Sequence, residues 1–217
     1  MDTSKPRQHV YWHELRSPVG TLVTLLDVMS QGFAGEAPAE LQDLLERAKR
    51  QADRLSGMLA AAHDLERLRW GTLAVRREPV DLAGALRAAA TVVEPAAKTR
   101  AVALEVKASE PVQVAADPAL LPRCLEGLLR GAIEASVRGG SVSVELARVE
   151  GLATVTARIA APMDAAALAQ AFTEESALGI RGGSGLGLYE VKLLVEAMGG
   201  SAGTRDGALS VGLPGKA

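Results

Sequence analysis

Apolar residues recur every three or four positions between residues 12 and 62, a spacing that predicts two long amphipathic helices. The first stripe consists of Trp12, Leu15, Val19, Leu22, Leu26, Met29 and Phe33, and the second of Leu41, Leu45, Ala48, Ala52, Leu55, Leu59 and Ala62. Gly32 ends the first helix, Pro38 suits the first turn of the second, and Gly71 stops it. Residues 1–71 therefore form an antiparallel hairpin, and pairing with a second copy as a four-helix bundle would cover the apolar surface that one hairpin leaves exposed.

From Thr72 onward the pattern changes to mixed helices and strands. We expect strands at 73–77, 102–106, 112–115, 141–148, 152–159 and two within 201–213, and helices at 81–98, 117–137, 165–172 and 186–198. Asp81 and Asp117-Pro118 are helix starts, and Glu150-Gly151 is a hairpin turn. The class is α+β, with residues 72–217 forming an α/β sandwich of one mixed sheet covered by helices on one face.

The composition excludes several classes of function. The 217 residues carry 24 Lys plus Arg against 26 Asp plus Glu with the signs interleaved, which disfavours nucleic-acid binding and polybasic membrane attachment. The single Cys124 excludes an internal disulfide and a thiolate zinc cluster, and we expect it to pack in a helix interior. No stretch is apolar enough for a membrane segment, so a soluble, cytoplasmic protein is expected.

The segment His13-Glu14-Leu15-Arg16-Ser17-Pro18 carries the clearest chemistry. An imidazole on the polar face of a helix is a nucleophile, and the adjacent carboxylate can orient it and take up its proton. Ser17 lies one turn beyond His13, and Pro18 removes the backbone donor that would bond to Glu14, so the helix can bend there. A metal pair of His9 and His13 lacks an evident third ligand, and His63 is expected on the surface.

This six-residue segment resembles the H box of two-component sensor histidine kinases. Gly183, Gly185 and Gly187 open a helix that ends at Met198-Gly199-Gly200, and this resembles the family's second glycine box, whose backbone N–H groups hold phosphate. The resemblance covers nearly the whole chain. It implies a dimeric hairpin with the phosphorylated histidine, an ATPase-type (GHKL) sandwich, and response-regulator receiver domains as partners.

The resemblance fails at the nucleotide site. The family's pattern Asn-Leu-Leu-x-Asn-Ala, which helps to hold Mg²⁺, is replaced by a segment with Gly127 and Gly131. Each glycine either destabilises its helix, by about 0.5 to 1 kcal/mol, or brings another element close to it. The family's Asp-x-Gly-x-Gly box corresponds to residues 158–162 when positions are counted back from Phe172. Arg158 then takes the place of the carboxylate that accepts a hydrogen bond from the adenine amino group. A guanidinium only donates hydrogen bonds.

An intact phosphoacceptor beside a damaged nucleotide site predicts a phosphorelay histidine phosphotransferase. It would pass a phosphoryl group between receiver aspartates through His13, with Glu14, Arg16 and Ser17 assisting, and would need no ATP, Mg²⁺ or other metal of its own. Residues 72–217 would then be a degenerate ATP-binding domain whose glycine box is a remnant. Two alternatives stay open: an active histidine kinase whose arginines (Arg130, Arg158, Arg181) grip phosphates, and a non-catalytic dimeric scaffold or phosphatase.

Overall fold

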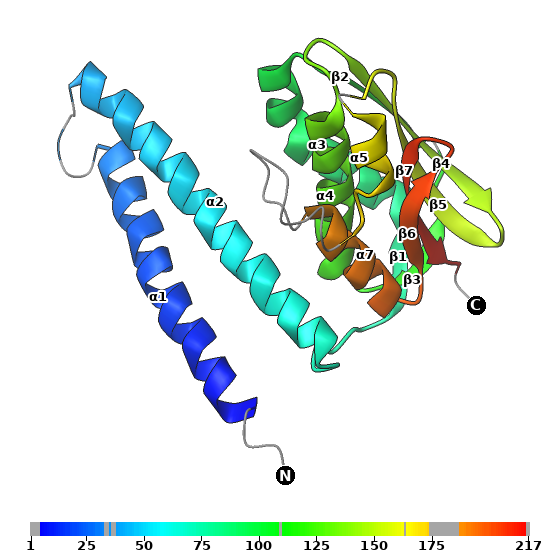
Figure 1. The fold of residues 1–217 in the computed structure, drawn as a ribbon, viewed down its shortest axis with the longest axis horizontal. Helices are drawn as coiled ribbons and strands as arrows, with labels where there is room; N and C mark the ends of the chain where they lie inside the picture. Colours follow the sequence, from blue (N-terminus) through cyan, green and yellow to red (C-terminus); the bar gives the residue numbers. More distant parts are fainter. Residues whose placement is uncertain are drawn as a thin grey trace. The chain divides into compact units, whose positions relative to one another are not determined.

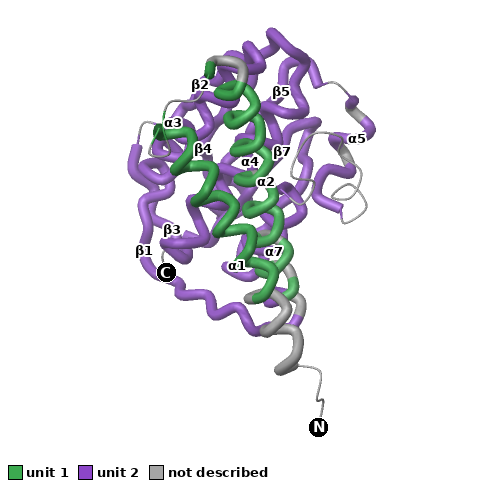
Figure 2. Tube along the Cα trace, turned by 90° about the vertical axis from the view of Figure 1, so that its left-hand side faces the viewer, with its two compact units in different colours: residues 1–66 green, residues 67–217 purple. Residues whose placement is uncertain are grey.

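The computed structural model describes residues 5–32, 35, 38–108, 110–162, 164–173 and 187–215. The chain divides into two compact units, residues 1–66 and 67–217 (Figure 2). This division falls near the boundary expected from the sequence, inside the second long helix. The functional meaning given to the two parts stays a proposal.

The first unit is a hairpin of two long helices, α1 (Lys5–Ser30) and α2 (Ala39–Arg69), which run side by side (Figure 1). Their antiparallel register is fixed by cross-helix pairs, since Asp27 binds Lys49 and Arg16 contacts His63. The backbone carbonyl of Pro38 accepts from the first turn of α2. Gly71 adopts a φ of +61°, which glycine tolerates and which ends the helix as the sequence predicts.

Among the hairpin side chains that the structure describes, a narrow seam is buried between the two helices. Leu26, Leu45 and Ala52 form a small cluster with Val23 packed against it. Large apolar side chains of both helices stay exposed: Leu15, Leu22, Leu25, Val28, Met29, Leu41, Leu44, Leu55 and Met58. The stripe expected on α1 is therefore split, since Leu26 faces α2 while Leu15, Leu22 and Met29 do not.

The second unit is a helix-covered sheet, as the sequence predicts. Its strands are β1 (Glu78–Asp81), β2 (Ala103–Lys107), β3 (Gln113–Ala116), β4 (Ser141–Val149), β5 (Leu152–Ile159), β6 (Ser201–Arg205) and β7 (Ala208–Pro214). Its helices are α3 (Leu82–Arg100), α4 (Leu120–Ala135), α5 (Ala165–Ala169) and α7 (Gly187–Ala197). The main sheet has the order β2-β4-β5-β7-β6, with β2 parallel to β4 and the other pairs antiparallel.

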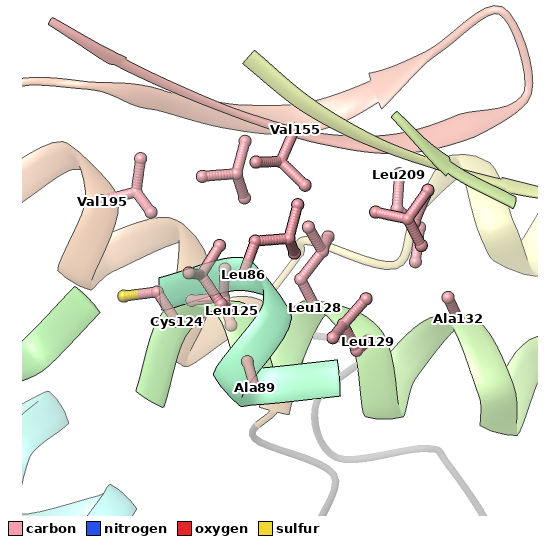
Figure 3. Packing of buried hydrophobic residues seen from close by; sticks show 14 of the residues in the cluster. Leu86, Ala89, Cys124, Leu125, Leu128, Leu129, Ala132, Val155, Val195 and Leu209 are labelled. Carbon is pink, nitrogen blue, oxygen red and sulfur yellow. The ribbon is translucent and has the colours of Figure 1, made fainter. Parts of the chain in front are cut away.

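Three helices cover one face of this sheet and enclose the core (Figure 3). Leu125, Leu128 and Leu129 of α4 are fully buried at the centre, beneath strand residues such as Val155 and Leu209 and beside α3 and α7. Burying side chains of this size contributes about 1.5 to 3 kcal/mol each. The opposite face of the sheet carries smaller and polar residues, because side chains alternate along each strand.

Two sequence predictions are wrong in this unit. Residues 73–77 form no strand, because the backbone N–H of Arg76 donates to Asp117 (2.8 Å) and the guanidinium of Arg77 donates to the carbonyl of Ala197 (3.2 Å). The strand lies at β1 instead and pairs with β3 in a two-stranded sheet, which is separate from the main sheet in the described part of the unit.

Candidate functional site

The four predicted catalytic positions all lie on α1. The side chain of His13 lies outside the part of the chain that the structure describes. Glu14, Arg16 and Ser17 are exposed. These three positions therefore present polar side chains to solvent within one turn of position 13.

Pro18 lies inside α1 without ending it. Proline lacks a backbone N–H, so the carbonyl of Glu14 loses its donor four residues on. One turn further along, the hydroxyls of Thr21 and Thr24 donate to the carbonyls of Ser17 and Gly20, each at 3.0 Å. Such back-bonding weakens the helical ladder slightly, and both features therefore loosen α1 next to His13.

His63 meets Arg16 across the hairpin, which the sequence did not predict. The Nη2 atom of Arg16 lies 3.2 Å from Nδ1 of His63, and the His63 side chain is half-buried rather than on the open surface. The expectation for His63 was therefore wrong. Predicting the Arg16–His63 pair requires the register of α1 against α2. The spacing of apolar residues within each helix does not determine that register.

In the second unit, α4 and α7 meet at Gly127 and Gly131. A Cβ atom placed on Gly127 would lie 2.6 Å from Cγ2 of Val191, and one on Gly131 would lie 2.8 Å from three side-chain carbons of Leu188. Val191 is 2% exposed and Leu188 is 6% exposed. Of the two expectations for these glycines, close approach of another element is confirmed.

An ion pair and a buried thiol lie close to the contact between α4 and α7. The guanidinium of Arg123 pairs with Glu190 at 2.5 Å, and the Glu190 side chain is only 15% exposed. Cys124, next to Arg123, is fully buried in α4 as predicted. Burial raises the pKa of the Cys124 thiol to about 12, and the carboxylate of Glu190 adds to that rise. This thiol is therefore a packing group rather than a nucleophile.

The end of β5 differs from the sequence prediction. Arg158 is exposed, between the buried Ala157 and Ile159, and its guanidinium contacts the carbonyl of Asp206 at 3.4 Å. Its side chain therefore lies on the sheet face opposite α4, and the expectation that it stands in an adenine pocket is wrong.

The residues beside the end of α4 are Ala161 and Pro162. The N–H of Val137 donates to the carbonyl of Ala161 at 3.1 Å, and Ser136 forms a bridge with Pro162. Neither residue carries a carboxylate. The next acidic side chain, Asp164, accepts from Ala166 and Ala167 and caps α5.

The predicted glycine box is described only at its end. Gly183 and Gly185 lie outside the described residues, and Gly187 is the first residue of α7. The carbonyl of Gly187 lies 3.6 Å from the position of a Cβ on Gly127, so the start of α7 packs directly on α4.

Asp117 ties the start of α4 to the segment that precedes β1. Its carboxylate accepts from the backbone N–H groups of Arg76 (2.8 Å), Ala119 (2.9 Å) and Leu120 (3.3 Å). Burial acts to raise the pKa of this carboxyl, but the three donors outweigh it, so the pKa lies below its usual value. The helix itself begins at Leu120, two residues beyond Pro118, which the sequence places in its first turn.

Within the described part of the chain, no three His, Cys, Asp or Glu side chains converge as a possible metal site. In the same part, none of the helices has the length and apolar character needed to cross a bilayer.

A helical hairpin joined to a mixed sheet with helices on one face is the architecture of histidine kinase cores. The chain matches full-length ShkA, solved in complex with AMPPNP, with a TM-score of 0.77 and 22% identity over 98% of this chain and 46% of that one. It matches the Acinetobacter baumannii histidine kinase AdeS with a TM-score of 0.61 and 18% identity over 94% of this chain and 98% of that one. These likenesses show the fold.

Sequence comparison points to the same class. No protein-family model matches the chain. It is 29% identical over 203 residues to the sensor histidine kinase GacS of Pseudomonas protegens, and 27% identical to the sensor protein GacS of Pseudomonas syringae pv. syringae. Each match covers 88% of this chain and 22% of the relative. The chain is therefore homologous to GacS sensor histidine kinases, and it spans about a fifth of the length of these relatives.

Proposed function

We propose that this protein is a histidine phosphotransferase of a two-component phosphorelay, which passes a phosphoryl group between receiver aspartates through His13 and has lost ATP binding. The observation that carries the proposal is the packing of α7 on Gly127 and Gly131. The places where the family has two amide side chains are filled here by buried carbons of Val191 and Leu188.

The residues present do not fit Mg²⁺ and ATP. Restoring an amide at Gly127 or Gly131 requires α7 to move, because even a Cβ atom meets side-chain carbons at 2.6 to 2.8 Å. Residues 158–162 also offer no carboxylate for adenine. A charge-assisted hydrogen bond contributes about 1.5 to 3 kcal/mol, so its loss alone lowers affinity by roughly tenfold or more.

The proposed transfer uses groups of α1. A ring nitrogen of His13 attacks phosphorus of a receiver aspartyl phosphate, so an N–P bond forms as the P–O bond to the aspartate breaks. Glu14 orients the imidazole and takes up its proton, Arg16 lies near the transferred group, and Ser17 holds a water. The receiver supplies its own acidic pocket and metal, so the relay needs no ATP or Mg²⁺ site.

The partners follow from the two faces of the hairpin. The polar face of α1 would dock receiver domains. The exposed apolar side chains of both helices support a homodimer, because apolar surface of this extent favours burial against a second copy. A cytoplasmic location and the absence of nucleic-acid binding stay predictions from composition.

Two other functions are outcomes of the same test. Homology to GacS sensor histidine kinases and the likeness to ShkA, solved with AMPPNP, favour an active kinase. In that case Gly183, Gly185 and Gly187 would hold phosphate. A scaffold or phosphatase would keep the dimer and leave His13 unphosphorylated.

The deciding experiment compares two phosphoryl donors. The full chain is incubated with labelled ATP and Mg²⁺, and separately with a receiver phosphorylated on its aspartate, with His13→Gln as the control. Label on His13 only from the receiver supports the relay. Label from ATP supports the kinase, and label from neither supports the scaffold or phosphatase.

A further inference from the structure

Arg16 on α1 and His63 on α2 form a contact that spans the hairpin near the phosphoacceptor. Their side chains approach to 3.2 Å between Nη2 and Nδ1. Both residues belong to the same compact unit. Arg16 is exposed, whereas His63 is half-buried against the hairpin. One end of the contact is thus held by packing while the other faces solvent.

The chemistry of the two groups decides which one donates. A guanidinium has five N–H donors and no acceptor, so Nδ1 of His63 must be the acceptor. The contact therefore requires a neutral imidazole that carries its proton on Nε2. Arg16 selects this tautomer of His63, and the remaining N–H groups of the guanidinium stay available to a second partner.

The contact lies next to the phosphoacceptor position in the helix. Residues three apart on a helix are neighbours on one face, so Arg16 lies on the same side of α1 as His13. A free arginine side chain loses much rotamer entropy when a ligand fixes it. The hydrogen bond to the half-buried imidazole of His63 fixes the Arg16 side chain before the phosphoryl group arrives.

We propose that His63 is a positioning residue for phosphotransfer, which holds the Arg16 guanidinium in place beside His13. The inference rests on the proposed relay function. During transfer the N–P bond to His13 forms, the P–O bond to the receiver aspartate breaks, and the imidazole proton passes to Glu14. The unused N–H groups of Arg16 then contact the phosphoryl oxygens, while His63 acts on the transferred group only through Arg16.

The kinetic test measures transfer from a phosphorylated receiver to His13 in the full chain. His63→Leu removes the acceptor, so the Arg16 side chain must be ordered anew when the receiver binds. This cost is expected to slow transfer about two- to tenfold. His63→Asn keeps an acceptor oxygen near the position of Nδ1 and should restore most of the rate. Arg47→Ala removes a positive charge, like that of Arg16, from an exposed site on α2 and is the control, expected to transfer at the wild-type rate.

A double-mutant cycle separates positioning from a general structural role. In an Arg16→Ala background, His63→Leu should cause no further loss, because the group that it positions is gone. Equal losses in both backgrounds, or a wild-type rate for His63→Leu, would overturn the proposal.

A spectroscopic test does not depend on the relay function. Imidazole ¹⁵N shifts should show Nδ1 of His63 unprotonated and Nε2 protonated, with a change of this state in Arg16→Ala. If the wild-type chain takes no phosphoryl group from receivers, the proposed function fails while the shifts still report the pairing. A proton on Nδ1 in the wild-type chain contradicts the positioning role itself.

Discussion

Substitution of Gly131 by alanine tests the α4–α7 packing directly. In an open helix position, Gly→Ala stabilises by about 1 kcal/mol. At Gly131 the new Cβ would lie 2.8 Å from three carbons of Leu188, which is 6% exposed and has little room to move. Overpacking of this kind costs about 1 to 3 kcal/mol. Because three carbons are involved, we take the upper part of that range, for a net loss of about 1 to 2 kcal/mol.

Gly57 of α2 is the matched control, since a Cβ there meets nothing within 4 Å. Gly57→Ala should raise the free energy of opening of its helix by about 1 kcal/mol. The assay is native-state amide hydrogen exchange, read on α4 for Gly131→Ala and on α2 for Gly57→Ala. The two substitutions should therefore change local stability in opposite directions.

A double substitution identifies the contact responsible. Leu188→Ala alone should cost about 2 to 5 kcal/mol as a buried truncation. Combined with Gly131→Ala it should cost at least about 1 kcal/mol less than the sum of the single effects, because the new methyl group occupies the space that Leu188 leaves. Strict additivity, or a stabilising Gly131→Ala, would refute the close packing and reopen the space for a nucleotide.

Three further predictions concern other parts of the molecule. Asp117→Asn should lower stability by about 1 to 3 kcal/mol near neutral pH, because its carboxylate accepts from three backbone donors. Because the folded-state pKa of Asp117 is lowered, the difference from wild type in urea titrations should be full above the ordinary pKa of an aspartate and shrink as the pH falls below it. A constant difference down to acid pH would contradict this. Cys124, whose thiol pKa is about 12, should resist iodoacetamide at pH 8 until urea unfolds the second unit, and rapid labelling of the folded chain would show the burial to be wrong. Leu25→Glu, at a side chain that is 56% exposed, should shift the molar mass in light scattering from dimer to monomer. The control Val92→Glu, at a 50% exposed site of α3, should leave the molar mass unchanged. Equal masses for the two variants would argue against the hairpin as the dimer interface.

Local signals in the sequence predicted most of the elements. Asp81 caps α3 by accepting from Ala83, and Glu150 and Gly151 form the tight β4–β5 turn with φ of +53° and +83°. The hairpin and the mixed sheet follow from helical and alternating periodicity. These features depend on neighbours along the chain, and a sequence pattern records them directly.

Long-range pairing could not be predicted in the same way. Residues 73–77 are not a strand because Asp117, far along the chain, takes the N–H of Arg76. Arg158 was assigned to a pocket by counting residues, yet the alternation of β5 turns it to the other face of the sheet. The glycines of α4 signalled a close approach, but only the fold identifies Leu188 and Val191 of α7 as the groups that fill the space.

The proposed relay function requires that the second unit no longer holds a nucleotide. Isothermal titration of the full chain with ATP in the presence of Mg²⁺ tests it most directly, with a nucleotide-binding histidine kinase as the positive control. We predict no saturable heat at millimolar ATP, because α7 occupies the positions beside Gly127 and Gly131. A saturable, Mg²⁺-dependent binding curve in the micromolar range would contradict the account.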